Sequence, residues 1–177
     1  MIVGASGAGK DTIINKFAEL QPDFCVARRY ITRNTLDSNE AFISVPSGEF
    51  KTLAQEDVFC LTWSAHDCQY GISKDIYKSY LKGERVVLSI SRSVLNDAIA
   101  LFPSHKIINI TANQDVLRSR LLARGRENSE QIDARIARST HKIPQNIQYS
   151  TLHNNGSVNE AVSTLMALIE GQEEMSL

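Results

Sequence analysis

The sequence has 177 residues, of which 42% are hydrophobic and 22% charged, as expected for one globular domain that is large enough to bury a core. Its 19 basic and 20 acidic residues give a net charge of −1, so no overall field attracts nucleic acid or a membrane surface. There is no signal peptide and no apolar run long enough to cross a bilayer, so we expect a cytoplasmic protein without a nucleic-acid or membrane partner.

The first half of the chain predicts three helices and several short strands. We expect helices at about residues 10–20, 47–55 and 74–82, with Ser47 as the N-cap of the second and Gly83 ending the third. Strand-prone segments are 25–33, 42–45 and 58–63, and a polar loop should follow Trp63 as far as Tyr70. Only three residues precede Gly4, whereas buried strands usually have about five or six, so we expect that the first strand is truncated.

The second half alternates strands and helices more regularly. Strands are expected at 85–90, 106–110 and 148–152, and helices at 92–101, 113–123, 128–142 and 157–170. Asn128 with Gln131, and Ser157 with Glu160, have the spacing of capping boxes. This alternation predicts a single α/β domain over residues 1–177, in which helices flank a parallel central sheet. The mixed segment at about residues 34–72 interrupts the alternation, and an insert of this kind usually binds the substrate.

The most informative motif joins the first strand to the first helix and has the pattern G-x-x-x-x-G-K of the phosphate-binding loop (P-loop) of nucleoside triphosphate enzymes. Glycines let successive backbone N–H groups point at the phosphates, and the lysine and the helix N-terminus add positive charge. The alternative is a glycine-rich turn without a ligand. We predict that ATP phosphates bind the whole segment, Gly4, Ala5, Ser6, Gly7, Ala8, Gly9, Lys10, Asp11 and Thr12.

The metal site departs from the usual pattern. The residue after the lysine usually carries the hydroxyl that binds Mg²⁺, but here it is Asp11, so Thr12 must reach the metal directly or through a water molecule. The cysteines and histidines show no metal-ligand spacing, and we expect the three cysteines to be reduced thiols. No later strand ends in the acidic residue of a Walker B motif, since Ser89-Ile90-Ser91 ends in serine. A phosphate acceptor, which is already an anion near neutral pH, would need no catalytic base.

Arginine, which can bind phosphate in a bidentate manner, gathers in three parts of the sequence. Alternation along a strand places Arg29 and Arg33 on one side and Arg28 on the other. The alternative for each arginine is a solvated surface charge, and Arg118 is the best candidate for that alternative. The groups are Arg28, Arg29 and Arg33, then Arg118, Arg120, Arg124 and Arg126, then Arg135 and Arg138.

With these motifs, the chain resembles the guanylate kinase family over nearly its whole length. The shared segments are the phosphate loop, Ile31-Thr32-Arg33, Trp63 followed by Tyr70-Gly71, Arg124-Gly125 and Asn154-Asn155. The guanine-binding residues do not match. This chain has Thr62 where the family has glutamate, Ile72 where it has a hydroxyl, and Leu36 where it has a second phosphate-binding arginine. A site without the carboxylate should discriminate poorly for the base, so GMP is not the expected acceptor.

The chain more closely resembles the ribose 1,5-bisphosphate phosphokinases of phosphonate degradation, a divergent branch of this fold. That family has G-x-S-G-x-G-K-D at the positions of Gly4 to Asp11, so Asp11 is an expected variation. Further matching segments are residues 29–33, 63–65, 70–71, 91–92, 124–128, 134–135 and 152–156.

The resemblance implies that ATP, with Mg²⁺, phosphorylates the phosphosugar α-D-ribose 1,5-bisphosphate to 5-phosphoribosyl 1-diphosphate. It implies that Lys10, Arg120, Arg124 and Arg126 are catalytic, the arginines as part of a lid over about residues 120–138. It also implies that Asn154 and Asn155 lie near adenine, and that the acceptor is bound by Arg29, Arg33, Tyr70, Arg92 and Arg135. The alternatives are a guanylate or other nucleoside monophosphate kinase, or a non-catalytic binding module, which would typically have lost the phosphate loop.

Overall fold

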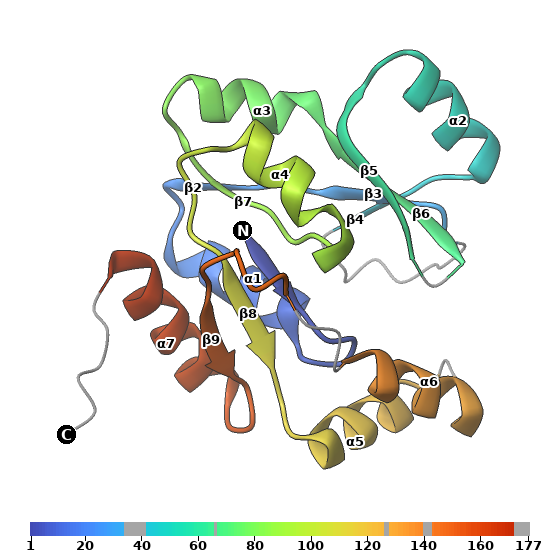
Figure 1. Ribbon diagram of the computed structural model, residues 1–177, viewed down its shortest axis with the longest axis vertical. Coiled ribbons are helices and arrows are strands. Elements are labelled where there is room, and N and C mark those ends of the chain that lie inside the picture. Colours follow the sequence, from blue (N-terminus) through green and yellow to red (C-terminus); the bar gives the residue numbers. More distant parts are fainter. Residues whose placement is uncertain (34–41, 66, 126–127, 140–142, 172–177) are drawn as a thin grey trace. The chain divides into compact units, whose positions relative to one another are not determined.

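The computed structural model describes residues 1–33, 42–65, 67–125, 128–139 and 143–171 (Figure 1). The chain forms two compact units, which we call the P-loop unit (Met1–Phe17 and Lys106–Leu177) and the insert unit (Ala18–His105). Helix α1 (Lys10–Leu20) begins in the first unit and ends in the second, and it has the predicted bounds. None of the described helices is both long and apolar enough to cross a membrane.

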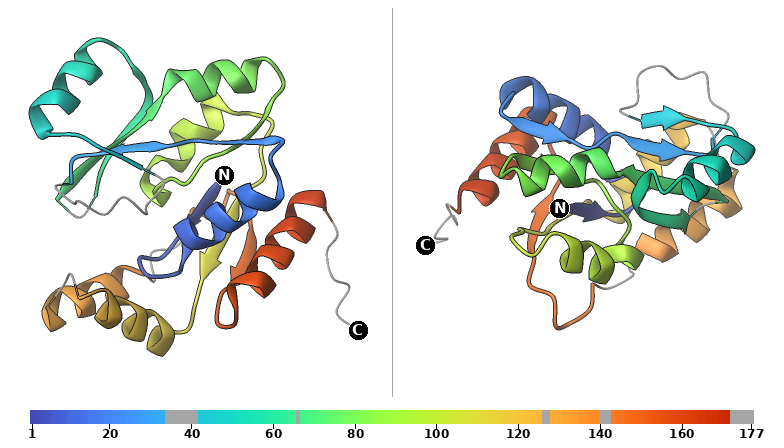
Figure 2. Two further views of the ribbon diagram at one scale, coloured as in Figure 1. Left: turned by 180° about the vertical axis from the view of Figure 1, so that it is seen from behind. Right: turned by 90° about the horizontal axis from the view of Figure 1, so that it is seen from above.

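The P-loop unit contains a three-stranded parallel sheet in the order β1 (Ile2–Gly4), β8 (Ile108–Thr111) and β9 (Ser150–His153). Helix α7 (Val158–Glu170) packs against β9, and α5 (Gln114–Arg124) and α6 (Ser129–Ser139) lie side by side (Figures 1 and 2). The wholly apolar cluster that joins α5 to α6 consists of Leu121, Ile132 and Ile136. These elements confirm the predicted α/β fold with a parallel sheet flanked by helices.

Both predicted capping boxes are present in this unit. Asn128 N–H donates to Gln131 Oε1 at 3.0 Å, and Gln131 N–H donates to Asn128 Oδ1 at 2.9 Å. Ser157 and Glu160 make the same reciprocal pair at the start of α7. A short-range polar pattern thus sets where these helices begin.

The insert unit contains two sheets. Strands β2 (Phe24–Val26) and β7 (Arg85–Val87) pair in parallel, and a mixed sheet has the order β4 (Phe42–Ser44), β3 (Arg29–Ile31), β6 (Cys68–Ser73), β5 (Phe59–Ala65). Its helical segments are α2 (Ser47–Gln55), α3 (Lys74–Leu81), the 3₁₀ turn η1 (Arg92–Val94) and α4 (Leu95–Leu101). The mixed pairing agrees with the irregular pattern of the insert.

Two local predictions for the insert unit were wrong. The expected polar loop between Trp63 and Tyr70 is much shorter than predicted, because β5 continues to Ala65 and β6 begins at Cys68, and the two strands pair antiparallel through Trp63 opposite Tyr70 and Ala65 opposite Cys68. Pairing between strands, which a single segment does not reveal, overrides the polar composition here. The N-cap of α2 is Pro46, whose carbonyl accepts a hydrogen bond from Phe50 N–H at 2.9 Å, so Ser47 is the first residue of the helix.

Candidate active site

The phosphate loop is held by backbone geometry that only glycine adopts readily. Gly4, Gly7 and Gly9 have φ values of 150°, 81° and 83°. A Cβ atom at Gly4 would lie 2.0 Å from the carbonyl oxygen of Ile110, so any other residue would displace β1 from β8. Ala8 N–H donates to the Ala5 carbonyl at 3.3 Å and closes the turn. The loop therefore leaves the end of a buried strand and curls directly into the N-terminus of α1, which is a favourable position for an anion.

Lys10 is the first residue of α1, and its side chain folds back over the loop. Its Nζ donates hydrogen bonds to the carbonyl oxygens of Gly4 at 3.0 Å and of Ala5 at 2.8 Å. The ammonium charge thus lies across the start of the loop, beside the segment whose N–H groups would bind phosphate.

Asn154 lies directly after β9 and holds the other side of the loop. Its Nδ2 donates to the carbonyl oxygen of Ala8 at 2.8 Å, and the residue is only 4% exposed. Asn155 is exposed, and its Oδ1 accepts a hydrogen bond from Asn113 N–H at 2.8 Å. Of the two asparagines predicted to lie near adenine, Asn154 therefore directs its amide nitrogen at the loop, and Asn155 remains the candidate for the base.

Two of the predicted arginines reach the loop. Arg120 Nη1 donates to the carbonyl oxygen of Asn154 at 3.0 Å and lies 3.8 Å from where a Cβ atom of Gly9 would be. Arg135 Nη1 donates to Ser6 Oγ at 2.8 Å. This contact places Arg135 beside the phosphate loop, and the predicted role of Arg135 in binding the acceptor stays a prediction.

Of the other arginines in and after α5, the structure describes the side chain of Arg118 but not those of Arg124 and Arg126. Arg118 forms an ion pair with Asp133 that links α5 to α6, as expected for an arginine without a phosphate ligand. Arg124 is the last residue of α5, but its side chain is outside the described part of the chain, as is the whole of Arg126. Their predicted roles in a lid remain predictions.

Among the described side chains of α1, those of Asp11 and Thr12, in the first turn, lie next to Lys10 in the sequence and could offer an oxygen ligand to a metal ion. Mg²⁺ prefers oxygen ligands and at kinase sites usually takes one or two from the protein, with the rest from phosphates and water. Within the described residues no group of three His, Cys, Asp or Glu side chains could form a metal cage. A carboxylate and a hydroxyl beside the phosphate loop nevertheless fit Mg²⁺ chemically.

In the insert unit, one face of the mixed sheet carries several predicted acceptor-binding residues. Ile31 on β3 pairs with Tyr70 on β6, which in turn pairs with Trp63 on β5. The Trp63 and Tyr70 rings stack with centroids 5.3 Å apart and planes 5° apart. Because side chains alternate along a strand, Arg29 shares this face with Ile31, and Arg33 follows with the same parity. The strand predicted over residues 25–33 is divided into β2 and β3, with Arg28 between them and Arg33 two residues beyond β3, so the grouping of Arg29 with Arg33 stays a prediction.

Arg92 is placed by the other sheet of the insert unit. Strands β2 and β7 are parallel, so their carboxyl ends lie at the same edge, where ligands of open α/β sheets usually bind. The chain leaves this edge through Arg28 and Arg29 after β2, and through Ser91 and Arg92 after β7. Two arginines that were predicted to bind the acceptor thus follow the same sheet edge.

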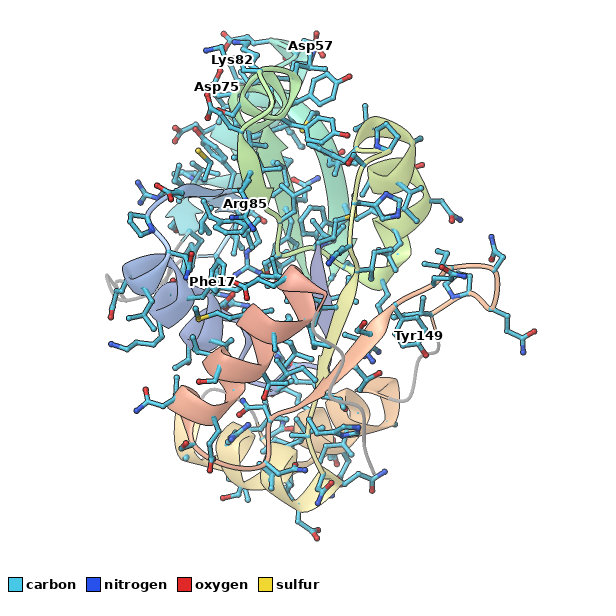
Figure 3. All side chains as sticks on the ribbon, turned by 90° about the vertical axis from the view of Figure 1, so that its left-hand side faces the viewer. Phe17, Asp57, Asp75, Lys82, Arg85 and Tyr149 are labelled. Carbon is cyan, nitrogen blue, oxygen red and sulfur yellow. The ribbon has the colours of Figure 1, made fainter. Side chains whose placement is uncertain are left out.

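The described part of the insert unit also contains surface ion pairs and three cysteines, none of which we assign to the candidate active site. Asp57 pairs with Lys74 and Asp75 with Lys78, and Figure 3 shows Asp57 and Asp75 at the same end of the insert unit. The three cysteines are free, as predicted. A hydrogen bond to Glu84 raises the pKa of Cys25, and burial raises the pKa of Cys60. Neither of these thiols has the lowered pKa of a catalytic nucleophile.

Comparison with known proteins identifies the family. The family model for guanylate kinase matches residues 1–172. The chain belongs to the guanylate kinase family. The guanylate kinase of Anaplasma phagocytophilum has a similar structure, with a TM-score of 0.66, 14% sequence identity, and coverage of 99% of this chain and 86% of that one. At this identity the likeness shows the guanylate kinase fold alone.

Closer relatives lie within the predicted branch of the family. The chain is 39% identical over 174 residues to the ribose 1,5-bisphosphate phosphokinase PhnN of Rhizobium etli, covering 97% of this chain and 88% of the relative. It is 35% identical over 172 residues to the protein of the same name from Ruegeria sp. strain TM1040, covering 97% and 90%. These matches confirm the resemblance to ribose 1,5-bisphosphate phosphokinases within the guanylate kinase family.

The sequence analysis missed two contacts of the phosphate loop. Asn154 was assigned to the adenine, and its hydrogen bond to Ala8 was not foreseen. The contact between Ser6 and Arg135 was also missed. The contact between Asn154 and Ala8 could have been predicted from the sequence, because Asn154 follows the carboxyl end of a strand in the same parallel sheet as the strand before the loop.

Proposed function

We propose that this chain transfers the γ-phosphoryl group of ATP to the 1-phosphate of α-D-ribose 1,5-bisphosphate, which gives ADP and 5-phosphoribosyl 1-diphosphate. The observation that carries the proposal is the 35% and 39% identity, over 97% of the chain, to two proteins named for this phosphokinase activity. The phosphate loop with Lys10 supports ATP as the donor.

The donor side of the mechanism rests on positive charge at the loop. The N–H groups of the loop and the N-terminus of α1 would bind the β- and γ-phosphates. Lys10 would exchange its carbonyl partners for phosphate oxygens, and Arg120 would stabilise the charge that develops on the transferred group. Asp11 or Thr12 would hold Mg²⁺ directly or through water, and the ion would supply positive charge against the negative charge of the ATP phosphates.

The residues of the insert unit support an acceptor other than GMP. Ile72, which stands where a guanylate kinase has a hydroxyl, is fully buried, and Thr62 stands where the family has glutamate. A site built to hydrogen-bond guanine loses discrimination when these groups are missing. We infer that Arg29, Arg33 and Arg92, together with Tyr70, bind the two phosphates of the sugar, and that Arg135 acts on the donor side through its position at Ser6.

The transfer needs no base from the protein. An oxygen of the 1-phosphate attacks the γ-phosphorus in line, while the bond from the γ-phosphorus to the bridging oxygen breaks and leaves its electron pair on ADP. The acceptor oxygen carries no proton near neutral pH because the second pKa of a phosphate monoester is about 6. The segment Ser89-Ile90-Ser91, which stands where the acidic residue would be expected and contains no carboxylate, is consistent with this chemistry.

The test is a coupled assay of ADP release with ribose 1,5-bisphosphate or GMP as acceptor, with the diphosphate product identified by ³¹P NMR. We expect turnover with the bisphosphate and formation of a new diphosphate signal. Faster turnover with GMP would replace the proposal with a guanylate kinase. If neither these two acceptors nor other nucleoside monophosphates were phosphorylated, a non-catalytic binding module would be the better description.

A further inference from the structure

Asn154 contacts the phosphate loop at a carbonyl group, where it can act on the shape of the loop. Its Nδ2 lies 2.8 Å from the carbonyl oxygen of Ala8, a residue 146 positions earlier in the chain. Only the nitrogen end of the amide can face a carbonyl oxygen favourably, so the chemistry determines the orientation of the side chain. The contact leaves the N–H groups of the loop available to phosphate, because it uses an acceptor rather than a donor.

The backbone of the same residue binds an arginine and a neighbouring strand. Its carbonyl oxygen accepts a hydrogen bond from Arg120 Nη1 at 3.0 Å, and its N–H donates to the carbonyl oxygen of Thr111 at 2.7 Å. Asn154 is thus anchored to the end of β8. From that anchor it holds the loop through its side chain and Arg120 through its main chain.

The packing around the amide leaves it little freedom. A Cβ atom at Gly9 would lie 2.6 Å from Asn154 Nδ2, so the amide fills the space beside the loop backbone. Among the described residues, no group forms a hydrogen bond with Asn154 Oδ1, although this atom is buried. A buried acceptor without a partner lowers the stability of the fold, so stability alone does not explain why an asparagine stands at this position.

We propose that Asn154 is a positioning residue that holds the phosphate loop and Arg120 in a common arrangement before ATP binds. This inference rests on the proposed function, since it assumes that the loop receives ATP. Asn154 acts through Ala8 and Arg120 and contacts none of the reacting atoms. Its benefit is preorganisation: the donors that stabilise the transferred group are already in place and need not rearrange during the reaction.

The test compares Asn154→Ala with Asn154→Asp, which is nearly the same size but has no amide donor for Ala8. His153→Ala, at the exposed residue that ends β9, is the matched control. The first readout is amide hydrogen exchange of residues 4–10 without nucleotide, and the second is binding of a non-hydrolysable ATP analogue measured by calorimetry. We expect faster exchange in the loop in both Asn154 variants, and roughly five-fold weaker binding in Asn154→Ala, about the effect of one lost hydrogen bond. Asn154→Asp should bind the analogue more weakly still, because its carboxylate also repels the phosphates. The control should match the wild type.

A double mutant tests the connection to Arg120. Asn154→Ala keeps the main-chain carbonyl that binds Arg120, so it can affect Arg120 only if loss of the amide releases that carbonyl from its position beside the loop. In that case Asn154→Ala should lower kcat roughly ten-fold in the wild-type background and much less in an Arg120→Ala background, because interacting residues are not additive. Unchanged loop exchange and analogue binding in a folded Asn154 variant would overturn the proposal, as would additive effects on kcat. If the alanine variant does not fold, the aspartate variant decides. Exchange and analogue binding require no acceptor, so a wild-type protein that rejects ribose 1,5-bisphosphate would contradict the proposed function and leave this test intact.

Discussion

Gly7 and Gly9 offer a matched pair of substitutions in the phosphate loop. Their φ values are 81° and 83°, so the backbone strain caused by alanine should be similar at the two positions, about 1–2 kcal/mol. Their surroundings differ. A Cβ atom at Gly7 would lie 3.2 Å from Cγ of the buried Leu121, which would have to give way by only a few tenths of an ångström, whereas at Gly9 it would lie 2.6 Å from Nδ2 of Asn154, a much closer approach.

The difference between the two variants can be estimated from these contacts. To relieve the close approach at Gly9, the Asn154 amide must move away from the Ala8 carbonyl, which loses a hydrogen bond and leaves a buried acceptor without a partner. That loss is worth about 1–3 kcal/mol. We therefore expect Gly9→Ala to lower the free energy of unfolding by roughly 2–5 kcal/mol, compared with about 1–2 kcal/mol for Gly7→Ala.

Urea denaturation followed by far-UV circular dichroism measures both free energies of unfolding. The same pair in an Asn154→Ala background provides the control, because removal of the amide should abolish most of the excess cost at Gly9. Equal destabilisation by Gly7→Ala and Gly9→Ala in the wild-type background would refute the reasoning, since it would mean that the amide yields without cost.

Three further predictions concern single groups. Lys10→Ala should lower kcat roughly a hundred-fold or more, by comparison with loss of other groups that stabilise transition-state charge, and wild-type ADP release would contradict the mechanism. Because the hydrogen bond from Cys25 to Glu84 raises the pKa of the thiol, Glu84→Gln should lower that pKa, and Cys25 should react faster with iodoacetamide at pH 8; an unchanged rate would argue against the contact. The Ser157 N–H lowers the pKa of Glu160 below its ordinary 4.5. Glu160 should therefore stabilise the wild type relative to Glu160→Gln above about this pH, and the advantage should disappear as the pH falls through the lowered pKa; a constant difference from pH 7 to pH 3 would count against it.

The features that the sequence predicts well depend on neighbouring residues. The phosphate loop combines glycines at fixed spacing with Lys10, and α1 begins and ends at the predicted residues. The capping boxes need only residues three positions apart. In each case the interacting groups are within one turn or loop, so the spacing alone carries the information.

The features that were missed depend on pairing over long distances in the chain. Strand β6 was taken for a loop because its own residues do not reveal that it pairs with β5 on one side and β3 on the other. Asn154 and Ala8 are 146 positions apart, and Arg135 and Ser6 are 129 apart. The arginines were predicted to be phosphate ligands from their chemistry, and Arg118 was already set apart as a surface charge. The contact of Arg135 with Ser6 and the partner of Arg118, Asp133, are seen only in the structure.

The proposed change of acceptor follows from what the insert unit keeps and what it loses. The guanylate kinase fold does not itself specify an acceptor, so specificity must come from side chains. Recognition of a base requires hydrogen-bonding groups. Ile72, which stands where the guanylate kinases resembled by this chain have a hydroxyl, is apolar and fully buried. Binding a second phosphate requires charge instead, and Arg29 and Arg92 follow the carboxyl ends of the parallel strands β2 and β7. Loss of the hydrogen bonds weakens binding of GMP, while Arg29 and Arg92 offer positive charge to a second phosphate, so both features favour a sugar bisphosphate as the acceptor.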